Sequence, residues 1–477
     1  MDGNRRIWKK SQPRIAQLDS HPLPPIPEDN YAVYMMRAMA SHDGDKPSVI
    51  DAESGDYRTY SYLKENVPRV AGGLQSSGVQ QGDVVMFLSP NHIDYQLLLL
   101  SVVYCGATFA PVNPDLQSGE LHHMIKKSGA RWAICHPSKL GNFMKARALL
   151  PRNTLQKVWV LEKQSNDSIY SLADHSPVNP VNIDNGLDFK KSVALILFSS
   201  GTTGLPKGVM LSHQNLLLSH AINKYLQGLL TPEQAAAGRK VYERPLLMMP
   251  MCHLFGFVIT MGVLVSGSTV ILLKRFGPKS FFEAIEKYKV TMCTLVPHLV
   301  NFLSKTPLYD QYDTSSILGF ASGTAPLGEE STNSFTKKTG RALGSGYGLT
   351  ETGGVTGNGG PLGFKAGSVG KVMPYIKIKV SPSELELILL SHKGISEAAV
   401  IGVPHERTGE APRAYVVPVP GANLDAKQLH EYVKERVVPY KQVTGGIVFV
   451  DSLPRNLTGK LLRKKLQEEY KKTKSKL

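Results

Sequence analysis

A ten-residue run rich in glycine and hydroxyl side chains constrains this chain most. The run SSGTTGLPKG occupies residues 199–208 and directly follows the apolar run 194–198. The apolar run is typical of a buried strand, and residues 214–228 have the apolar spacing of a helix, which Ser212 can cap. A strand, a loop of small residues and a helix in this order indicate an α/β fold.

The same run predicts a phosphate-binding loop. Glycines allow tight turns that point N–H groups at phosphate oxygens, hydroxyls add donors, and a lysine adds positive charge. A flexible hairpin of small residues is the simpler alternative. The run is not a Walker A loop, because Gly208 follows Lys207 where a serine or threonine would hold magnesium. The candidates for phosphate contact are Ser199, Ser200, Gly201, Thr202, Thr203, Gly204 and Lys207.

Strand-like and helix-like segments alternate over most of the chain. The strand patterns lie at 84–88, 131–135, 158–161, 193–198, 268–273 and 291–295, and the helical patterns at 94–104, 119–127, 214–228 and 280–288. This alternation predicts βαβ units and doubly wound parallel sheets. Because 477 residues are too many for one small core, we expect several subdomains.

The last hundred residues have a different pattern. Strand patterns at 398–401, 414–417 and 446–450 and a helical pattern at 425–436 predict a small α+β unit. A strand-like stretch at 376–380 directly adjoins a helix-like stretch at 383–386. We therefore expect a large domain at 1–380 and a small domain at 381–477.

Residues 246–273 contain no Asp, Glu, Lys or Arg, and by length alone they could cross a bilayer. Pro250, His253, Gly256 and the small residues 266–268 interrupt the stretch. These breaks favour a loop, a short apolar helix and a buried strand, so we expect no membrane span.

Charge and cysteine content exclude two further classes. The net charge of +16 is concentrated at the two ends of the chain, and no basic motif interleaved with aromatic residues indicates nucleic-acid binding. The four cysteines are far apart in sequence, so we expect small buried side chains rather than disulfides or a zinc site. They are Cys105, Cys135, Cys252 and Cys293.

The phosphate loop resembles the signature of adenylate-forming enzymes of the 4-coumarate–CoA ligase and firefly luciferase type. His253, in the run PMCHLFG, resembles the family's gate histidine beside the acyl pocket. Thr324, in GTAPLG, resembles the turn that packs on adenine. Arg275 lies where relatives carry a basic residue facing the CoA nucleotide, and Lys460, in PRNLTGK, resembles the lysine that neutralises charge as the acyl-adenylate forms.

A further motif, GYGLTET at 346–352, resembles the family's adenine and metal signature. The resemblance implies that Tyr347, flanked by Gly346 and Gly348, stacks on adenine. It also implies that Thr350 contacts the α-phosphate and that Glu351 helps to hold magnesium. With Lys460 and His253, Thr350 and Glu351 are the residues that the resemblance assigns to catalysis.

Together these motifs imply an ATP-dependent acid–CoA ligase with ATP, Mg²⁺ and coenzyme A as partners. The fold that the resemblance implies is a large adenylation domain and a small C-terminal lid domain. Phe255, Phe257 and Ile259 suggest an apolar pocket for an aryl-propenoic or a medium-to-long fatty acid. A protein that binds nucleotide or acyl ligand without catalysis and a luciferase-like monooxygenase are the alternatives.

The chain departs from the family near residue 380. In relatives, several dozen residues separate the strand resembled by 376–380 from the helix resembled by 382–386. That stretch carries the aspartate that grips the ribose hydroxyls and the hinge of the lid domain. We therefore expect an internal deletion, a lid domain truncated at its start, and impaired activity. Ser345 also replaces the glutamine common in the plant enzymes.

The sequence ends in Ser475, Lys476 and Leu477. This tripeptide is the address that the peroxisomal import receptor reads, and lysines precede it in a polar segment. A solvated lysine-rich tail is the simpler alternative. We expect the protein to be peroxisomal.

Overall fold

The computed structural model describes residues 23, 25–199, 207–228, 241–325, 327–359, 362–376, 382–405, 409–437, 441–455 and 461–474. The chain divides into two compact units, Met1–Ile376 and Lys377–Leu477. The boundary expected between residues 380 and 381 lies within 377–381, outside the described residues.

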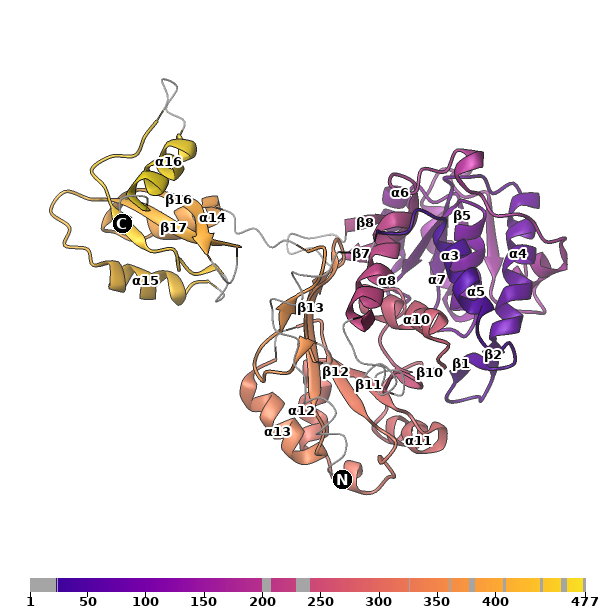
Figure 1. The fold of residues 1–477 in the computed structure, drawn as a ribbon. Helices are drawn as coiled ribbons and strands as arrows, with labels where there is room; N and C mark the ends of the chain where they lie inside the picture. Colours follow the sequence, from indigo (N-terminus) through magenta and orange to yellow (C-terminus); the bar gives the residue numbers. More distant parts are fainter. Residues whose placement is uncertain are drawn as a thin grey trace. The chain divides into compact units, whose positions relative to one another are not determined.

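The first unit contains a six-stranded sheet in the order β6-β5-β3-β4-β7-β8. Its strands β5, β7 and β8 are labelled in Figure 1. Its neighbouring strands are parallel except for the antiparallel pair of β7 and β8. The strands are β3 (Val84–Leu88), β4 (Thr108–Val112), β5 (Trp132–Cys135), β6 (Lys157–Val160), β7 (Val193–Ser199) and β8 (Lys207–Ser212). The connecting helices are α5 (Tyr95–Tyr104), α6 (Ser118–Ser128) and α7 (Pro137–Ala148).

A nine-stranded sheet, in the order β15-β14-β13-β12-β11-β9-β10-β1-β2, completes this unit. It is parallel from β1 to β13 and antiparallel at both edges. Its strands are β1 (Pro47–Asp51), β2 (Tyr57–Thr59), β9 (Pro245–Leu247), β10 (Val270–Leu272), β11 (Met292–Leu295), β12 (Gly319–Ser322), β13 (Leu343–Leu349), β14 (Gly353–Asn358) and β15 (Lys371–Val372). The helices between them are α10 (Leu254–Ser266), α11 (Pro278–Tyr288), α12 (Pro297–Lys305) and α13 (Glu329–Thr339). The predicted α/β class is confirmed.

One apolar core joins the two sheets, with α5 at its centre. Every residue of α5 from Tyr95 to Val103 is buried, and the helix packs on α3 (Tyr31–Ala40) and α4 (Tyr60–Ser76). Burial on all sides explains why this helix is mostly apolar, with Gln96 and Ser101 as its buried polar residues. The helix α8 (His213–Gly228) follows β8, and Ser212 Oγ accepts a hydrogen bond from the Asn215 N–H (3.3 Å). The predicted cap is therefore confirmed.

The apolar stretch 246–273 contains the end of β9, a loop, α10 and β10. The predicted loop, helix and strand are confirmed, whereas β9 was not predicted. Gly267 ends α10 in the left-handed region at φ 68°, where a glycine is favoured. Within the described ranges no helix is both long and apolar enough to cross a membrane. All four cysteines are buried and unpaired, as predicted.

The second unit has a three-stranded sheet in the order β16-β17-β18. Its strands are β16 (Ile395–His405), β17 (Gly409–Pro418) and β18 (Ile447–Phe449), and its helices are α14 (Pro382–Leu390), α15 (Ala426–Lys434) and α16 (Arg463–Lys474). The strands β16 and β17 are much longer than predicted. Their antiparallel hydrogen-bond ladder continues beyond the apolar centre of each strand, where cross-strand pairing keeps the residues extended. Buried side chains of α14, α15 and the sheet form the core of this unit.

Candidate active site

The phosphate loop lies at the end of the β7–β8 hairpin. Ser199 and Lys207 are opposite each other in the antiparallel ladder, and the Lys207 side chain is exposed. Gly208 is opposite Phe198, and a Cβ atom at position 208 would lie 3.3 Å from the Phe198 ring. The glycine after Lys207 thus makes room for a cross-strand aromatic ring. Ser200, Gly201, Thr202, Thr203 and Gly204 lie outside the described residues.

The turn that follows β12 carries the predicted adenine contact. Thr324 is exposed and has φ 74°, which is an unfavourable backbone conformation for a β-branched residue. Strain of this kind is concentrated at functional sites, where the surrounding structure enforces it. The turn lies close to α10, because a Cβ atom at Gly323 would be 3.7 Å from the Phe255 ring.

The β13–β14 hairpin presents Tyr347, which is 41% exposed, between two glycines. A Cβ atom at Gly346 would lie 3.0 Å from the Thr356 carbonyl oxygen, and one at Gly348 would lie 2.5 Å from the Gly353 carbonyl oxygen. Both positions therefore need glycine for the two strands to approach. Thr350 and the exposed Glu351 occupy the turn between these strands.

β12 and β13 are neighbours, with Ser322 opposite Ser345. This pairing makes the strand before the strained turn at Thr324 a neighbour of the strand that carries Tyr347. Ser322, Ser345 and Asn358 line a cavity of about 20 Å³ beside them, which is large enough for one water molecule. Thr324 and Tyr347, which are 23 residues apart in sequence, are thus placed at adjacent strands by the fold.

Asn358 fixes the loop that covers β13, a role that sequence analysis missed. Its buried amide donates to the carbonyls of Lys365 (2.8 Å) and Ser368 (2.7 Å), and its Oδ1 accepts from the Lys365 N–H (2.8 Å). Ser345 Oγ donates to the same Ser368 carbonyl (2.9 Å). Ser345 is therefore part of the support of this strand.

His253 immediately precedes α10 and is exposed, although its side chain makes no cap hydrogen bond to the helix. Partial desolvation lowers the pKa of His253 below its usual value, which favours the neutral imidazole. On α10, Phe255 and Ile259 are half-buried, whereas Phe257 is 3% exposed and packs against Tyr31. Helical spacing turns Phe257 into the core, whereas Phe255 and Ile259 keep part of their apolar surface accessible. The acyl pocket itself stays a prediction.

Arg275 follows β10 and is highly exposed. One of its guanidinium nitrogens lies 3.7 Å from the Asp115 carboxylate, which Lys139 also approaches at 3.0 Å. The residue is therefore accessible to an anionic ligand, with a weak internal partner. Lys460 lies outside the described residues.

Glu351 is the candidate magnesium ligand. No group of three or more His, Cys, Asp and Glu residues that could hold a metal occurs in the part of the chain that the structure describes. A single carboxylate fits Mg²⁺ in a nucleotide site, because this ion takes one or two carboxylates together with phosphate oxygens and water.

Two family matches cover this architecture. Residues 36–394 match the family described as AMP-binding enzyme, and residues 384–460 match the AMP-binding enzyme C-terminal domain. The chain is 29% identical to 4-coumarate–CoA ligase 2 of Petroselinum crispum, over 89% of this chain and 91% of the relative. It is 28% identical to luciferin 4-monooxygenase of Photinus pyralis, over 86% of this chain and 88% of the relative.

Solved structures share the fold. ATP-bound MatB from Rhodopseudomonas palustris has a TM-score of 0.60 at 23% identity, over 93% of this chain and 99% of that chain. The anthranilate CoA ligase AuaEII in complex with anthranoyl-AMP has a TM-score of 0.63 at 19% identity, over 96% and 99%. The first family match extends over most of the chain, and the chain therefore belongs to the AMP-binding enzyme family.

Proposed function

We propose that this protein joins a carboxylic acid to coenzyme A through an acyl-adenylate, with an aryl-propenoic or fatty acid as substrate. The observation that carries the proposal is the pairing of β12 and β13, which brings the strained turn at Thr324 beside the strand of the exposed Tyr347. A strained turn and an accessible aromatic ring on neighbouring strands form a platform on which a flat base can bind. The exposed Lys207 at the phosphate loop supplies a positive charge for the triphosphate.

In the first step, a carboxylate oxygen attacks the α-phosphorus of ATP, and the bond to pyrophosphate breaks. The enzyme must hold the two reactants in line and stabilise the negative charge of the transition state and of the leaving group. Lys207 and Lys460 are cations suited to that task, and the Thr350 hydroxyl can donate to the α-phosphate. Mg²⁺ held at Glu351 would neutralise further phosphate charge.

In the second step, the sulfur of coenzyme A attacks the acyl carbonyl carbon. The thiol proton is lost to solvent or to a base, the thioester bond forms, and AMP leaves with the electrons of the mixed anhydride bond. The exposed Arg275 is suited to the phosphates of the incoming coenzyme A. Since the neutral form of His253 lacks charge, it can border an apolar acyl group at little electrostatic cost.

Two observations support the substrate class. The curated relatives include several named 4-coumarate–CoA ligase, with 28–29% identity. Phe255 and Ile259, two and six residues after His253, present half-buried apolar surface. This surface suits an aromatic ring or an alkyl chain better than a charged acyl group.

We also propose that the chain lacks an internal segment of the family, which favours a weakly active or purely ligand-binding form as the second candidate. The alignment with the Petroselinum crispum ligase runs over 515 positions but contains 89% of this 477-residue chain, about 425 residues. About 90 of its positions are therefore gaps in this chain, which supports a deletion of several dozen residues.

Pyrophosphate release from ATP with a panel of aryl-propenoic and fatty acids tests the proposal. Release that depends on one acid class, followed by acyl-CoA formation, is the expected result. Nucleotide binding without release for any acid would favour the ligand-binding form. Light emission with a luciferin in air would instead favour the monooxygenase alternative.

A further inference from the structure

We propose that Asn91 is a positioning residue, which holds the backbone in front of His253 and thereby sets the place of the gate histidine. This inference rests on the proposed function, because only there does His253 border the acyl group. The Asp94-centred hydrogen-bond network is the second part of the proposal, since it keeps the loop of Asn91 rigid.

Asn91 lies on the loop between β3 and α5 and is 7% exposed. Its Nδ2 donates to the Met249 carbonyl oxygen (3.1 Å), and its Oδ1 accepts from the Met251 N–H (2.9 Å). The side-chain amide therefore pairs with two backbone groups of one segment, as a neighbouring strand would. The Tyr95 hydroxyl adds a third bond by donating to the Met251 carbonyl oxygen (2.8 Å).

The segment that Asn91 and Tyr95 bind, residues 249–251, leads directly to His253. The His253 N–H donates to the Pro250 carbonyl oxygen (3.1 Å), which closes a tight turn. A Cβ atom at Gly256 would lie 2.2 Å from that same oxygen, so the turn is pressed against the first turn of α10. One side of the turn packs against α10 and the other side is bound by Asn91. The backbone position of His253 is therefore fixed.

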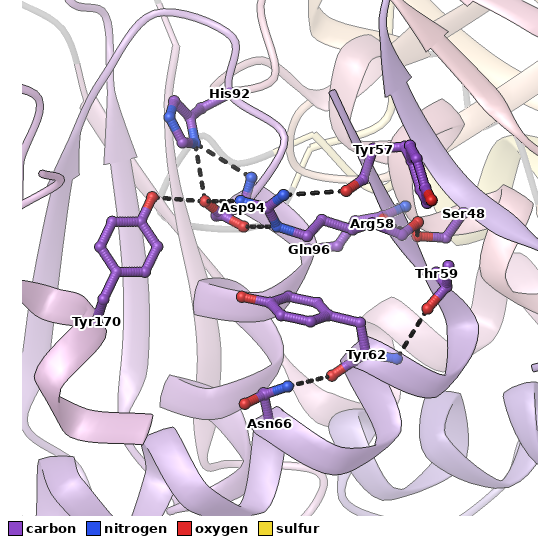
Figure 2. Close-up of polar contacts among 10 residues, drawn as sticks. All are labelled: Ser48, Tyr57, Arg58, Thr59, Tyr62, Asn66, His92, Asp94, Gln96 and Tyr170. Atoms are coloured by element: carbon purple, nitrogen blue, oxygen red, sulfur yellow. Dashed lines mark hydrogen bonds and ion pairs between the residues drawn. The ribbon is translucent and has the colours of Figure 1, made fainter. Parts of the chain in front are cut away.

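The loop of Asn91 is itself fixed by Asp94, at the centre of Figure 2. Arg58 binds the Asp94 carboxylate through Nε (2.5 Å) and Nη2 (3.0 Å), and the Tyr170 hydroxyl donates to it at 2.6 Å. Asp94 is completely buried. Although burial alone would lower the pKa of Arg58, its hydrogen bond with Asp94 raises that pKa above the usual value, so the guanidinium stays charged.

His92 completes the network without carrying charge. The Asp94 N–H donates to His92 Nδ1 (3.1 Å), so this nitrogen must be unprotonated. Burial lowers the pKa of His92 to about 4, despite the nearby Asp94 carboxylate. The network therefore fixes the backbone on the C-terminal side of Asn91 at neutral pH.

A separate contact connects α5 with α10. Ser48 Oγ donates to Gln96 Oε1 (2.9 Å), and Gln96 Nε2 donates to the Thr260 carbonyl oxygen (2.8 Å). Three side chains thus connect the start of α5 to residues 249–260. They are nearly or completely buried: Asn91, Tyr95 and Gln96. The helix α10, which carries Phe255 and Ile259, is thus positioned by residues at the start of α5 and in the loop before it.

The test is amide hydrogen exchange of the full chain, because it reads the held segment whether or not the protein is active. Asn91→Ala removes the acceptor of the Met251 N–H, and we expect that amide to exchange at least about tenfold faster. Asn91→Asp keeps the acceptor of the Met251 N–H but sets a carboxylate oxygen against the Met249 carbonyl oxygen, so it should restore only part of the protection. The matched control is Asn66→Ala, since the Asn66 amide donates only within α4, to the Tyr62 carbonyl (2.9 Å; Figure 2), and should leave Met251 unchanged.

Kinetics provide the second measurement. Asn91→Ala and Tyr95→Phe should raise KM for the acid by about tenfold and leave KM for ATP within about twofold. Unchanged exchange at Met251 in Asn91→Ala would overturn the positioning role, as would an equal rise of both KM values. If the parent chain released no pyrophosphate with any acid, the proposed function would fail, while the exchange data would still decide the role of Asn91.

Discussion

Ser199 and Lys207 are opposite each other at the end of the β7–β8 ladder, with the whole phosphate loop between them. The ladder therefore fixes both ends of the loop, although the loop itself lies outside the described residues. Because Lys207 begins a strand, its backbone position does not depend on the loop being ordered. This arrangement suits a lysine that must meet a triphosphate at a defined place.

We predict that Lys207→Ala or Lys460→Ala lowers the rate of acid-dependent pyrophosphate exchange at least about 100-fold. The first change weakens placement of the triphosphate, and the second removes positive charge from the transition state. Lys191→Ala is the control, because Lys191 is 87% exposed and pairs only with Asp188 on the surface. Parent-like exchange in both lysine variants would refute the assignment of adenylation chemistry to these residues.

We expect that restoring the internal segment that we propose this chain lacks raises activity. The family resemblance implies that this segment carries the aspartate that binds the ribose hydroxyls and the hinge of the lid domain. A variant with the segment of a 4-coumarate–CoA ligase inserted between Val380 and Ser381 should exchange pyrophosphate at least about tenfold faster than the chain as given. Equal rates would show that neither clamp nor hinge limits this enzyme.

We propose that the last residues direct the protein to peroxisomes. A fluorescent protein that ends in residues 466–477 should collect in peroxisomes, because the import receptor reads Ser475, Lys476 and Leu477 with their free carboxylate. Deletion of Leu477 should leave the fusion in the cytosol. A diffuse signal from the intact tail, in cells with a working import receptor, would reject this location.

The parts of the fold that sequence predicted are those with strong local patterns. Apolar runs separated by helical spacing predicted most of the parallel strands, and the motif glycines coincide with close strand approaches at Gly346 and Gly348. The antiparallel edges were not predicted. β14 and its neighbourhood are rich in glycine, which resembles a loop, and β8 follows the phosphate loop without any regular alternation of apolar residues.

The supports of the site were missed for a different reason. The residues next to Asn91 in the sequence indicate only an ordinary turn. Its hydrogen-bond partners, Met249 and Met251, lie 158 and 160 residues away in the sequence. Only the packing of α5 into the shared core brings them together. A polar residue next to a mostly apolar helix is the single local signal, and it does not reveal the partner.

The buried ion pair predicts a large stability effect. Asp94→Asn should lower the free energy of unfolding by about 3 kcal/mol, because it leaves the Arg58 guanidinium without its counter-ion and weakens the bond from Tyr170. Arg69→Gln is the control, since Arg69 and Glu65 form an exposed pair at 3.9 Å, worth at most about 0.5 kcal/mol. Urea unfolding of both variants measures the difference, and similar midpoints would argue against an important role for the pair.

The last prediction concerns the stability of the fold at low pH. It depends on three histidines that are neutral in the folded protein. Burial lowers the pKa values of His92, His213 and His220 to about 4 each. His213 Nδ1 accepts a hydrogen bond from the Tyr31 N–H (3.0 Å), and the His220 ring packs against Tyr31. Protonation of Nδ1 would break the first of these contacts, and a charged ring at either position would be buried away from water.

In the unfolded chain these imidazoles have a pKa near 6.5, so between about pH 6.5 and pH 4 the unfolded state binds more protons than the folded state. Stability is therefore complete above about pH 6.5 and falls as the pH drops toward 4, by up to about 3 kcal/mol for each histidine. Denaturant unfolding from pH 7 to pH 4 should show this loss, and His220→Gln should make the decline shallower. His175→Gln, at an exposed position, should not change the slope. If His220→Gln and His175→Gln declined in parallel with the parent, the acid sensitivity would have to come from other groups.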